Sequence, residues 1–273
     1  MRKLFVVLLL TAVFCSSKKP DTIVIESASL HCNDTVLVFS PSLEKNIPTL
    51  FLLHGYSDDY HAWSNHMDIR ELSEKTGFRI ICPDGFYASW YLDRKGEGEM
   101  KWRTFFWEEL WPLINDKYGL DPGKTFIDGL SMGGHGAINI FLDHPECFCG
   151  AGSMSGVLDL MKNDGTGRYY PVVYRYPATI EDCEGQSAYQ RASRLIEASK
   201  EYGFNVSDKL IVLSTGIQDY EYRHGTMKMA EACDDLGLNY IAFYSPAVHS
   251  WKYWTWVIDY HIQWFIQHME RGY

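Results

Sequence analysis

Lys124-Thr125-Phe126-Ile127-Asp128-Gly129-Leu130-Ser131-Met132-Gly133, continued by Gly134-His135-Gly136-Ala137-Ile138-Asn139-Ile140-Phe141-Leu142, is the stretch that decides the fold of this chain. It is typical of a short buried strand, a sharp turn with the pattern G-x-S-x-G, and a helix with a tightly packed first turn. A serine on such a turn adopts strained backbone angles, which require small residues two positions away on each side. The turn lifts the hydroxyl clear of the sheet, near a helix N-terminus that stabilises negative charge. The stretch predicts a nucleophile elbow at Ser131, and a glycine-rich turn whose serine only caps the helix is the alternative.

Strand-like and helix-like segments alternate along the chain, the pattern of a parallel sheet covered by helices. Apolar runs predict strands at residues 22–25, 35–39, 48–53, 78–82, 124–128, 151–156, 210–214 and 240–244. Helical spacing predicts helices at 69–76 (ended by Gly77), 105–118, 134–142, 187–202, 227–236 and 251–269. We expect an α/β fold, with a mostly parallel central sheet, helices on both faces and an antiparallel first strand pair. One domain, residues 22–273, is predicted, with an insertion at about 159–208 where the alternation breaks.

Composition excludes several kinds of partner. The 273 residues are 46% apolar, enough for one sizeable core, and the net charge is −10 with no lysine- or arginine-rich block. Binding to nucleic acid or to an anionic membrane surface is therefore not expected. Aromatic residues make up 15% of the chain and cluster at 86–111 and 251–264. These clusters fit either core packing or a pocket for an apolar or sugar-linked group.

The N-terminus resembles an export signal. Arg2 and Lys3 precede an apolar run at residues 4–14, which is too short to span a bilayer but fits a signal-peptide core. Residues 1–17 are therefore predicted to be a signal peptide, and the protein to be periplasmic, secreted or envelope-associated. A lipoprotein leader that ends before Cys15 stays open, with membrane contact only through a lipid at that cysteine.

The six cysteines beyond the leader do not suggest a metal site. Cys147-x-Cys149 has no second pair of Cys or His at zinc spacing. Free or occasionally paired structural thiols are expected, with no metal and no organic cofactor. Disulfide pairing and oligomeric state cannot be read from the sequence. The six are Cys32, Cys82, Cys147, Cys149, Cys183 and Cys233.

A serine nucleophile needs a positioned base, normally a histidine steadied by a carboxylate. In this architecture the order along the chain is serine, acid, histidine, with the histidine just after the final strand. His249 lies between the predicted last strand and last helix, and is the predicted base. The other histidines considered have weaker positions. His224 and His54 are less suitable, and His261 and His268 are expected to pack or to face solvent within the last helix.

Asp219 is the predicted acid, because it leaves the 210–214 strand through a turn at Gly216. Glu221 and Asp159 are rivals, and a role for Asp219 in capping the next helix is the alternative. The oxyanion of the tetrahedral intermediate needs two N–H donors. Met132, directly after the nucleophile, and Tyr56, after His54-Gly55, are predicted to supply them.

Several of these motifs together resemble the Putative esterase family. That family is similar to esterase D (S-formylglutathione hydrolase), tributyrin esterases, and feruloyl and acetylxylan esterases. The resemblance runs from about residue 47 to the C-terminus, and it rests on Leu53-His54-Gly55-Tyr56-Ser57, Pro83-Asp84-Gly85, Ser89-Trp90-Tyr91, Glu108-Glu109-Leu110, Gly129-Leu130-Ser131-Met132-Gly133-Gly134 and His249-Ser250-Trp251. It implies an α/β-hydrolase with Ser131, Asp219 and His249 as nucleophile, acid and base. It also implies Tyr56 and Met132 as oxyanion donors.

The substrate pocket is less well defined by the sequence. Trp90, Tyr91 and His135 are predicted to contact substrate, and core packing is the alternative for the two aromatic residues. His135 stands where tributyrin-type members commonly have tyrosine, whereas formylglutathione hydrolases can have histidine. The 159–208 insertion is expected to shape the acyl or alcohol pocket.

The predicted function is a serine carboxylic-ester hydrolase acting on short-chain acyl or polysaccharide-linked (acetyl or feruloyl) esters. An acyltransferase to a sugar or lipid alcohol would use the same residues. An S-formylglutathione hydrolase-like thioesterase is a further alternative, although an exported chain would rarely meet that substrate. A catalytically silent binding module is the alternative outside the enzymes. The natural ester is not determined by the sequence.

Overall fold

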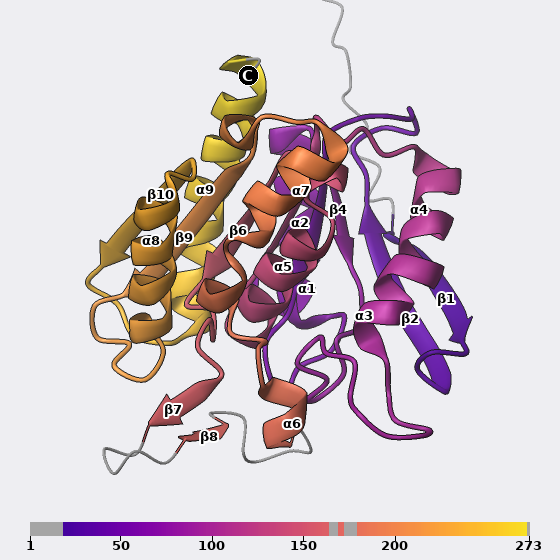
Figure 1. Cartoon of the computed structure of the whole chain (residues 1–273). Coiled ribbons are helices and arrows are strands. Elements are labelled where there is room, and N and C mark those ends of the chain that lie inside the picture. Colours follow the sequence, from indigo (N-terminus) through magenta and orange to yellow (C-terminus); the bar gives the residue numbers. More distant parts are fainter. Residues whose placement is uncertain (1–18, 164–168, 172–178, 272–273) are drawn as a thin grey trace, which may run out of the picture.

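The computed structural model describes residues 19–163, 169–171 and 179–271. The predicted leader at 1–17, with Cys15, lies outside these residues. Eight strands form one sheet in the order β1-β2-β4-β3-β5-β6-β9-β10 (Figure 1). The pairs β1–β2 and β2–β4 are antiparallel and all the others are parallel. The predicted α/β architecture with a mostly parallel sheet is confirmed.

The strands coincide with the predicted apolar runs to within a few residues. The main sheet contains β1 Asp21–Ser27, β2 Cys32–Phe39, β3 Thr49–Leu53, β4 Arg79–Cys82, β5 Thr125–Gly129, β6 Gly150–Met154, β9 Leu210–Gly216 and β10 Tyr240–Ser245. A separate antiparallel pair, β7 Met161–Asn163 and β8 Tyr169–Pro171, lies in the predicted insertion.

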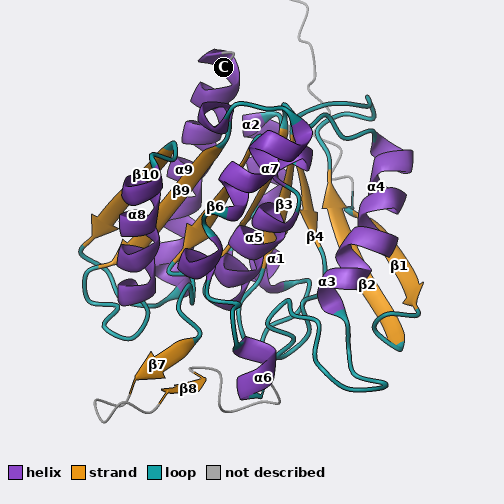
Figure 2. Cartoon of the chain, viewed as in Figure 1, coloured by secondary structure: helices purple, strands orange, loops and turns teal. Residues whose placement is uncertain are grey.

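The α-helices are α1 Ala62–His66, α2 Ile69–Thr76, α3 Trp102–Phe105, α4 Trp111–Tyr118, α5 Met132–Asp143, α6 Ile180–Cys183, α7 Arg194–Tyr202, α8 Arg223–Leu236 and α9 Trp251–Arg271. Figure 2 shows helices on both faces of the sheet. Helices α1, α2 and α9 cover one face, and α3, α4, α5, α7 and α8 cover the other. In the described part of the chain, no helix has both the length and the apolar character that crossing a membrane requires.

Two predicted helices differ from those observed. The helix expected at 105–118 begins at Trp102 and contains a π-helical segment, Phe106–Leu110, just before Pro112. Proline has no N–H to donate to the carbonyl four residues earlier, and the wider turn accommodates this. The helix expected at 187–202 is divided into a 3₁₀ segment, Ala188–Arg191, and α7.

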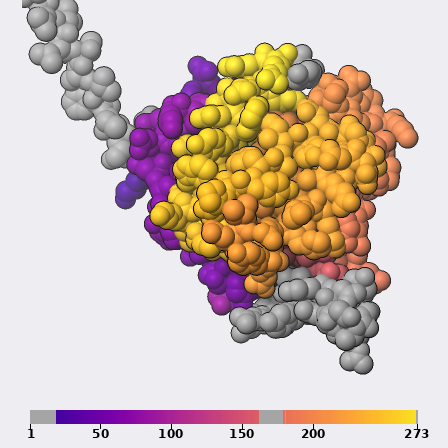
Figure 3. Space-filling model, turned by 90° about the vertical axis from the view of Figure 1, so that its left-hand side faces the viewer, coloured from indigo at the N-terminus to yellow at the C-terminus, as the bar shows by residue number. Residues whose placement is uncertain are grey.

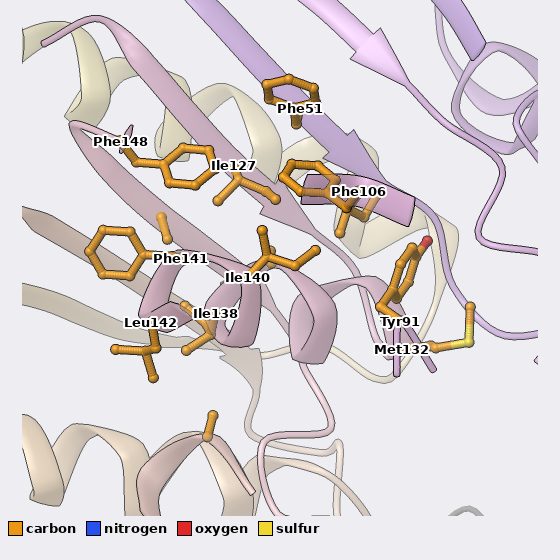
Figure 4. Packing of buried hydrophobic residues seen from close by; sticks show 14 of the residues in the cluster. Phe51, Tyr91, Phe106, Ile127, Met132, Ile138, Ile140, Phe141, Leu142 and Phe148 are labelled. Carbon is orange, nitrogen blue, oxygen red and sulfur yellow. The ribbon is translucent and has the colours of Figure 1, made fainter. Parts of the chain in front are cut away.

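Each face of the sheet has its own apolar core. Against α5, the side chains of β3 and β5 pack with Phe106, Phe141 and Phe148, as Figure 4 shows. On the opposite face, Phe126 stacks on Phe265 of α9 with ring centroids 4.5 Å apart. Residues from β9 onward, in orange and yellow, form most of the side of the molecule next to β10 (Figure 3). The two cores hold α5 and α9 in fixed positions on either side of β5.

The carboxyl ends of the parallel strands all lie along the same edge of the sheet, which runs across the strands. The loops after β3, β5, β9 and β10 therefore meet there, which is where functional residues of open α/β sheets gather. The insertion elements β7, β8 and α6 lie beyond the same edge (Figure 1). The six cysteines that the structure describes are free thiols. Burial raises the pKa of Cys82, on β4, to about 12.

We predict that Gly77→Ala lowers the free energy of unfolding by about 1 kcal/mol, because Gly77 ends α2 in the left-handed region that L-residues disfavour. Its φ is 77°, and an added Cβ would meet no atom within 4 Å, so the effect is purely conformational. Urea unfolding measures it. Gly77→Asn is the matched control and should lose less, since asparagine tolerates this conformation. Equal stability of the alanine variant and the parent would contradict the assignment.

Candidate active site

Ser131 lies on a strained turn between β5 and α5. Its backbone angles are φ 52° and ψ −115°, a conformation that non-glycine residues rarely adopt. A Cβ at Gly129 would lie 2.5 Å from the Gly133 carbonyl carbon and oxygen, so position 129 must lack a side chain. The serine is 8% exposed and lines a cavity. The turn thus presents one hydroxyl from an otherwise buried segment.

The loop after β3 closes against this turn. A Cβ added at Gly133 would lie 2.5 Å from the carbonyl oxygen of His54, and one added at Gly55 would lie 2.6 Å from the Leu130 side chain. The same atom on Gly55 would be 3.6 Å from Ser131 Cβ. Glycine at both positions therefore lets the two backbones approach, and it brings the 54–57 loop beside the serine.

His54 fixes the shape of that loop. Its Nδ1–H donates to the carbonyl oxygen of Gly55 (2.8 Å), and its Nε2 accepts the Gly85 N–H (2.7 Å). Both ring nitrogens are therefore occupied within the fold, and the ring is 1% exposed. His54 joins the loop after β3 to the loop after β4 and is not near enough to donate to or accept from Ser131 in this arrangement.

A continuous hydrogen-bonded chain links the serine, histidine and aspartate named by the sequence. The Nδ1–H of His249 donates to Asp219 Oδ2 (2.8 Å), and its Nε2 lies 2.9 Å from Ser131 Oγ, in position to accept the hydroxyl proton. Since an ionised carboxylate only accepts hydrogen bonds, Asp219 selects the tautomer whose Nε2 is unprotonated. The aspartate is buried, whereas the His249 side chain is 26% exposed.

The acid and histidine loops are packed onto each other. The N–H groups of Ile217 and Gln218 donate to the carbonyl oxygens of Ser245 (2.8 Å) and Ala247 (3.0 Å). A Cβ at Gly216 would lie 2.1 Å from the Ala247 oxygen, so this close approach requires glycine. The two loops therefore act as one unit that sets the distance from carboxylate to imidazole.

The rival acids occupy other places. Asp159 accepts from the Lys228 ammonium at 2.6 Å, away from the imidazole. Glu221 is exposed and lines the cavity. Among the rival histidines, His224 is exposed, and His261 and His268 are buried in α9, which is the packing alternative that the sequence had left open.

A cavity of about 640 Å³ opens over Ser131 and His249. Five of its lining residues are tyrosine or tryptophan and two carry carboxylates, and none of the described residues that line it is a lysine or an arginine. The lining is Gly55, Tyr56, Ser57, Asp58, Trp90, Leu130, Ser131, Glu221, Tyr222, His249, Ser250, Trp251 and Trp254. A second hollow of about 260 Å³ shares Glu221 and Tyr222 with it and reaches Met161 of the insertion.

Two aromatic residues that the sequence did not single out flank the imidazole. The ring centroid of Tyr222 is 4.6 Å from that of His249, and Trp254 meets it edge-to-face at 4.8 Å. The aromatic cluster at 251–264 gave the only sequence signal for Trp254. Nothing local marked Tyr222, which reaches the ring through the fold of the acid loop.

Only one of the three predicted substrate contacts lines the cavity. Trp90 does so, and it stacks on Tyr56 with centroids 6.2 Å apart. Tyr91 points into the core near Met132 (Figure 4), and its hydroxyl donates to the His54 carbonyl oxygen (2.9 Å). Both residues have positive φ, which turns the chain sharply at this point. Tyr91 is thus a packing residue, which corrects the prediction.

His135 also lies away from the cavity. Fully buried on α5, it contacts Asn139 of the same helix, with Nδ1 3.1 Å from the amide nitrogen. Burial holds the pKa of His135 well below its ordinary value, so the ring is neutral. His135 lies four residues after Ser131, and it is not among the residues that line the cavity. The predicted substrate contact at His135 is therefore wrong.

The predicted oxyanion donors Met132 and Tyr56 belong to the two segments that meet at Ser131. Met132 is the first residue of α5, where backbone N–H groups have no intrahelical acceptor. Tyr56 lies in the 54–57 loop and lines the cavity. Within residues 19–163, 169–171 and 179–271, no group of three or more His, Cys, Asp or Glu side chains could hold a metal ion.

Solved structures that are similar to this chain include esterases. The ferulic acid esterase structure superposes with a TM-score of 0.75 and 22% identity, covering 92% of this chain and 98% of that one. An S-formylglutathione hydrolase from Agrobacterium tumefaciens gives 0.72 and 20%, covering 92% and 94%. These similarities establish the fold.

A curated relative is the diacylglycerol acyltransferase/mycolyltransferase Ag85A of Mycobacterium leprae (strain TN). It is 33% identical over 123 residues, which is 42% of this chain and 37% of that protein. The match thus spans little more than a third of the relative's length. The family model described as "Putative esterase" matches residues 27–259. With the elbow, the sheet order and this match, the chain belongs to the Putative esterase family and has the α/β-hydrolase fold.

Proposed function

We propose that this protein is a serine esterase that hydrolyses carboxylic esters through an acyl-enzyme. The observation that carries the proposal is the chain Asp219–His249–Ser131, with contacts of 2.8 and 2.9 Å, at the base of an open cavity. Serine is a poor nucleophile unless a base removes its proton, and this arrangement supplies the base and its orienting carboxylate. Family membership is consistent with the same chemistry.

In the proposed first step, Ser131 Oγ attacks the ester carbonyl carbon as His249 Nε2 takes the hydroxyl proton. The carbonyl π electrons move to its oxygen, and Asp219 stabilises the imidazolium. The tetrahedral intermediate then collapses, the alcohol leaves with the proton from Nε2, and the acyl group stays on Oγ. Water deacylates the serine by the same route, with His249 again acting as base.

The oxyanion is proposed to bind the backbone N–H groups of Met132 and Tyr56. Met132 supplies the free end of the α5 helix dipole, which favours negative charge. The loop that carries Tyr56 packs closely on the serine, since a Cβ added at Gly55 would lie 3.6 Å from Ser131 Cβ. Both features support the proposal, because the two backbones lie close to Ser131.

The cavity favours neutral substrates. Trp90, Trp251 and Trp254 offer flat apolar surfaces for an acyl group or a sugar ring, while Asp58 and Glu221 accept hydrogen bonds from hydroxyls. Short-chain acyl esters or acetyl and feruloyl esters on polysaccharides fit this lining. A glutathione thioester carries a net negative charge, which the two carboxylates would repel. The S-formylglutathione alternative is therefore disfavoured. We also propose that the chain is exported, because its N-terminus resembles a signal peptide.

Acyl transfer is the second candidate, because the Ag85A relative is named as an acyltransferase. It would use the same three side chains, with an alcohol in place of water in the second half-reaction. Product analysis with added sugar and glyceride alcohols separates the two. A silent binding module is disfavoured by the intact contact between Ser131 and His249.

Stoichiometric labelling by a fluorophosphonate is expected for the wild type and absent in Ser131→Ala. His249→Ala should slow labelling by about 100-fold or more, since the general base is lost. His224→Ala is the control and should label at the wild-type rate, because this exposed histidine does not line the main cavity. Intact mass spectrometry reads the adduct. A folded wild type that takes no label would sink the proposal.

Asp219→Asn is expected to fold normally while kcat falls by about 10⁴-fold, because asparagine favours the wrong imidazole tautomer. Circular dichroism and steady-state kinetics on a p-nitrophenyl ester measure the two properties. Asp159→Asn serves as the comparison and should retain kcat within about threefold. The acid assignment fails if the larger loss of kcat occurs in the Asp159 variant.

The cavity carboxylates should discriminate between a neutral and an anionic ester of similar shape. We expect kcat/KM to be about tenfold higher for the neutral methyl 4-acetoxybenzoate than for the anionic 4-acetoxybenzoate, once the two values are corrected for intrinsic reactivity. This ratio corresponds to ~1.4 kcal/mol. Asp58→Asn/Glu221→Gln should reduce this ratio to about twofold. Burial raises the pKa of Asp58, so the assay is run at mildly alkaline pH to ionise it.

Asp59→Asn is the matched control for this substrate preference, since it removes an adjacent exposed carboxylate that does not line the cavity. Added salt should weaken the preference of the wild type. If the double variant keeps the wild-type ratio, the two carboxylates do not set charge selectivity.

A further inference from the structure

A second serine–histidine–aspartate chain lies buried beneath the candidate active site. The Nδ1–H of His261 donates to Asp128 Oδ2 at 2.7 Å, and its Nε2 lies 2.8 Å from Ser214 Oγ. All three residues are 0% exposed. No substrate can reach this serine, so the group is not a second catalytic centre. Its role must be exerted through the protein.

The donors and acceptors of this buried group are paired with one another or with the backbone. Asp128 Oδ1 accepts the Gly129 N–H at 2.7 Å and Oδ2 accepts from His261, so both carboxylate oxygens are occupied. A neutral ring then carries its proton on Nδ1 and accepts the Ser214 hydroxyl proton at Nε2. A Cβ at Gly152 on β6 would lie 2.2 Å from Asp128 Oδ2, so the neighbouring strand leaves space for the carboxylate. Such a satisfied buried network rigidifies its surroundings.

The three buried residues belong to the same elements that carry the proposed catalytic residues. Asp128 is the last but one residue of β5 and lies three residues before Ser131, and Ser214 lies on β9 five residues before Asp219. His261 lies on α9, whose first residue, Trp251, follows His249 by two positions. One set of hydrogen bonds therefore ties together β5, β9 and α9 directly under the loops that must meet.

We propose that Asp128, His261 and Ser214 are positioning residues for the reaction at Ser131, and we call these three the buried brace. This inference rests on the proposed esterase function. The brace fixes α9 against β5 and β9, and thereby sets the Ser131–His249–Asp219 distances. Each catalytic residue stands on a loop, and loops hold a reactive geometry only when rigid elements support them.

Small shifts in the Ser131–His249–Asp219 distances are expected to lower the rate strongly. A displacement of about 1 Å at the reacting groups can cost about 100-fold in rate, even when the mutation is distant. The loop-to-loop bonds at Ala247 hold the acid and histidine together, but they do not connect either loop to β5. The brace supplies that connection through side chains. The imidazole of His261, on α9, binds Asp128 of β5 through one nitrogen and Ser214 of β9 through the other.

Ser214→Ala is the principal test, because it removes one hydroxyl and leaves the other two residues in place. We expect kcat to fall by about 10- to 100-fold with KM unchanged within about threefold, and the fluorophosphonate labelling rate to fall in parallel. His261→Asn should have the same signature, since its shorter side chain cannot reach both partners. All assays are run well below the melting temperature of each variant. If His261→Asn does not fold, Ser214→Ala alone decides.

Two further variants separate positioning from general stability. His268→Asn is the matched control on α9, since His268 Nε2 lies 3.0 Å from the Asp208 carbonyl oxygen, at the far end of the helix. It should leave kcat unchanged. Asp128→Asn should keep the hydrogen bonds of the brace. The asparagine oxygen can accept the Gly129 N–H, and its NH₂ can donate to Nδ1 once the His261 proton has moved to Nε2. This variant should keep kcat within about threefold.

The outcomes are distinguishable. A folded Ser214→Ala that has wild-type kcat and labelling rate overturns the brace. So does an equal fall of kcat in His268→Asn, because the effect would then follow stability. A wild type that does not label, by contrast, overturns the proposed esterase function itself.

Discussion

The strained backbone of Ser131 is the constraint on which the rest of the structure depends. A residue with φ 52° and ψ −115° costs about 1–3 kcal/mol, and it persists only where surrounding packing determines it. Here that packing is exceptionally close, because Gly129 faces Gly133 and Gly133 faces the carbonyl oxygens at the end of β3. The same absence of side chains brings the 54–57 loop beside the hydroxyl. A single steric requirement therefore shapes both the nucleophile and the proposed oxyanion site.

Two hydrogen-bonded chains of the same composition lie close to this turn. In the chain at the cavity, His249 connects Ser131 to a buried carboxylate. In the buried chain, His261 of α9 connects a carboxylate on β5 to a serine on β9. Exposure separates their roles, since the His249 side chain is 26% accessible and His261 is fully buried. A reactive group requires solvent and substrate access, whereas a positioning group benefits from a dry environment where hydrogen bonds are strong.

Reaction and substrate choice depend on different parts of the molecule. The reacting groups follow the carboxyl ends of the parallel strands, where the sheet holds them rigidly. The cavity walls come from side chains on the surrounding loops, such as Trp90 and Tyr222, and from Trp254 in the first turn of α9. A smaller hollow extends from this cavity to Met161 in the insertion. Such a division lets one fold act on many esters, because loops can vary while the sheet and elbow stay fixed.

The sequence by itself determined the features with local causes. The glycines around Ser131, the alternation of apolar runs with helical spacing, and Gly77 at the end of α2 each express a short-range steric or burial rule. Only the tertiary structure decided which carboxylate contacts the imidazole, because Asp219 and Glu221 follow the same glycine turn and differ only in how that turn packs on Ala247. It also separated Trp90 from its neighbour in the core. The buried brace was invisible to sequence patterns because its hydrogen bonds join residues 133 and 47 positions apart, and only folding brings them into contact.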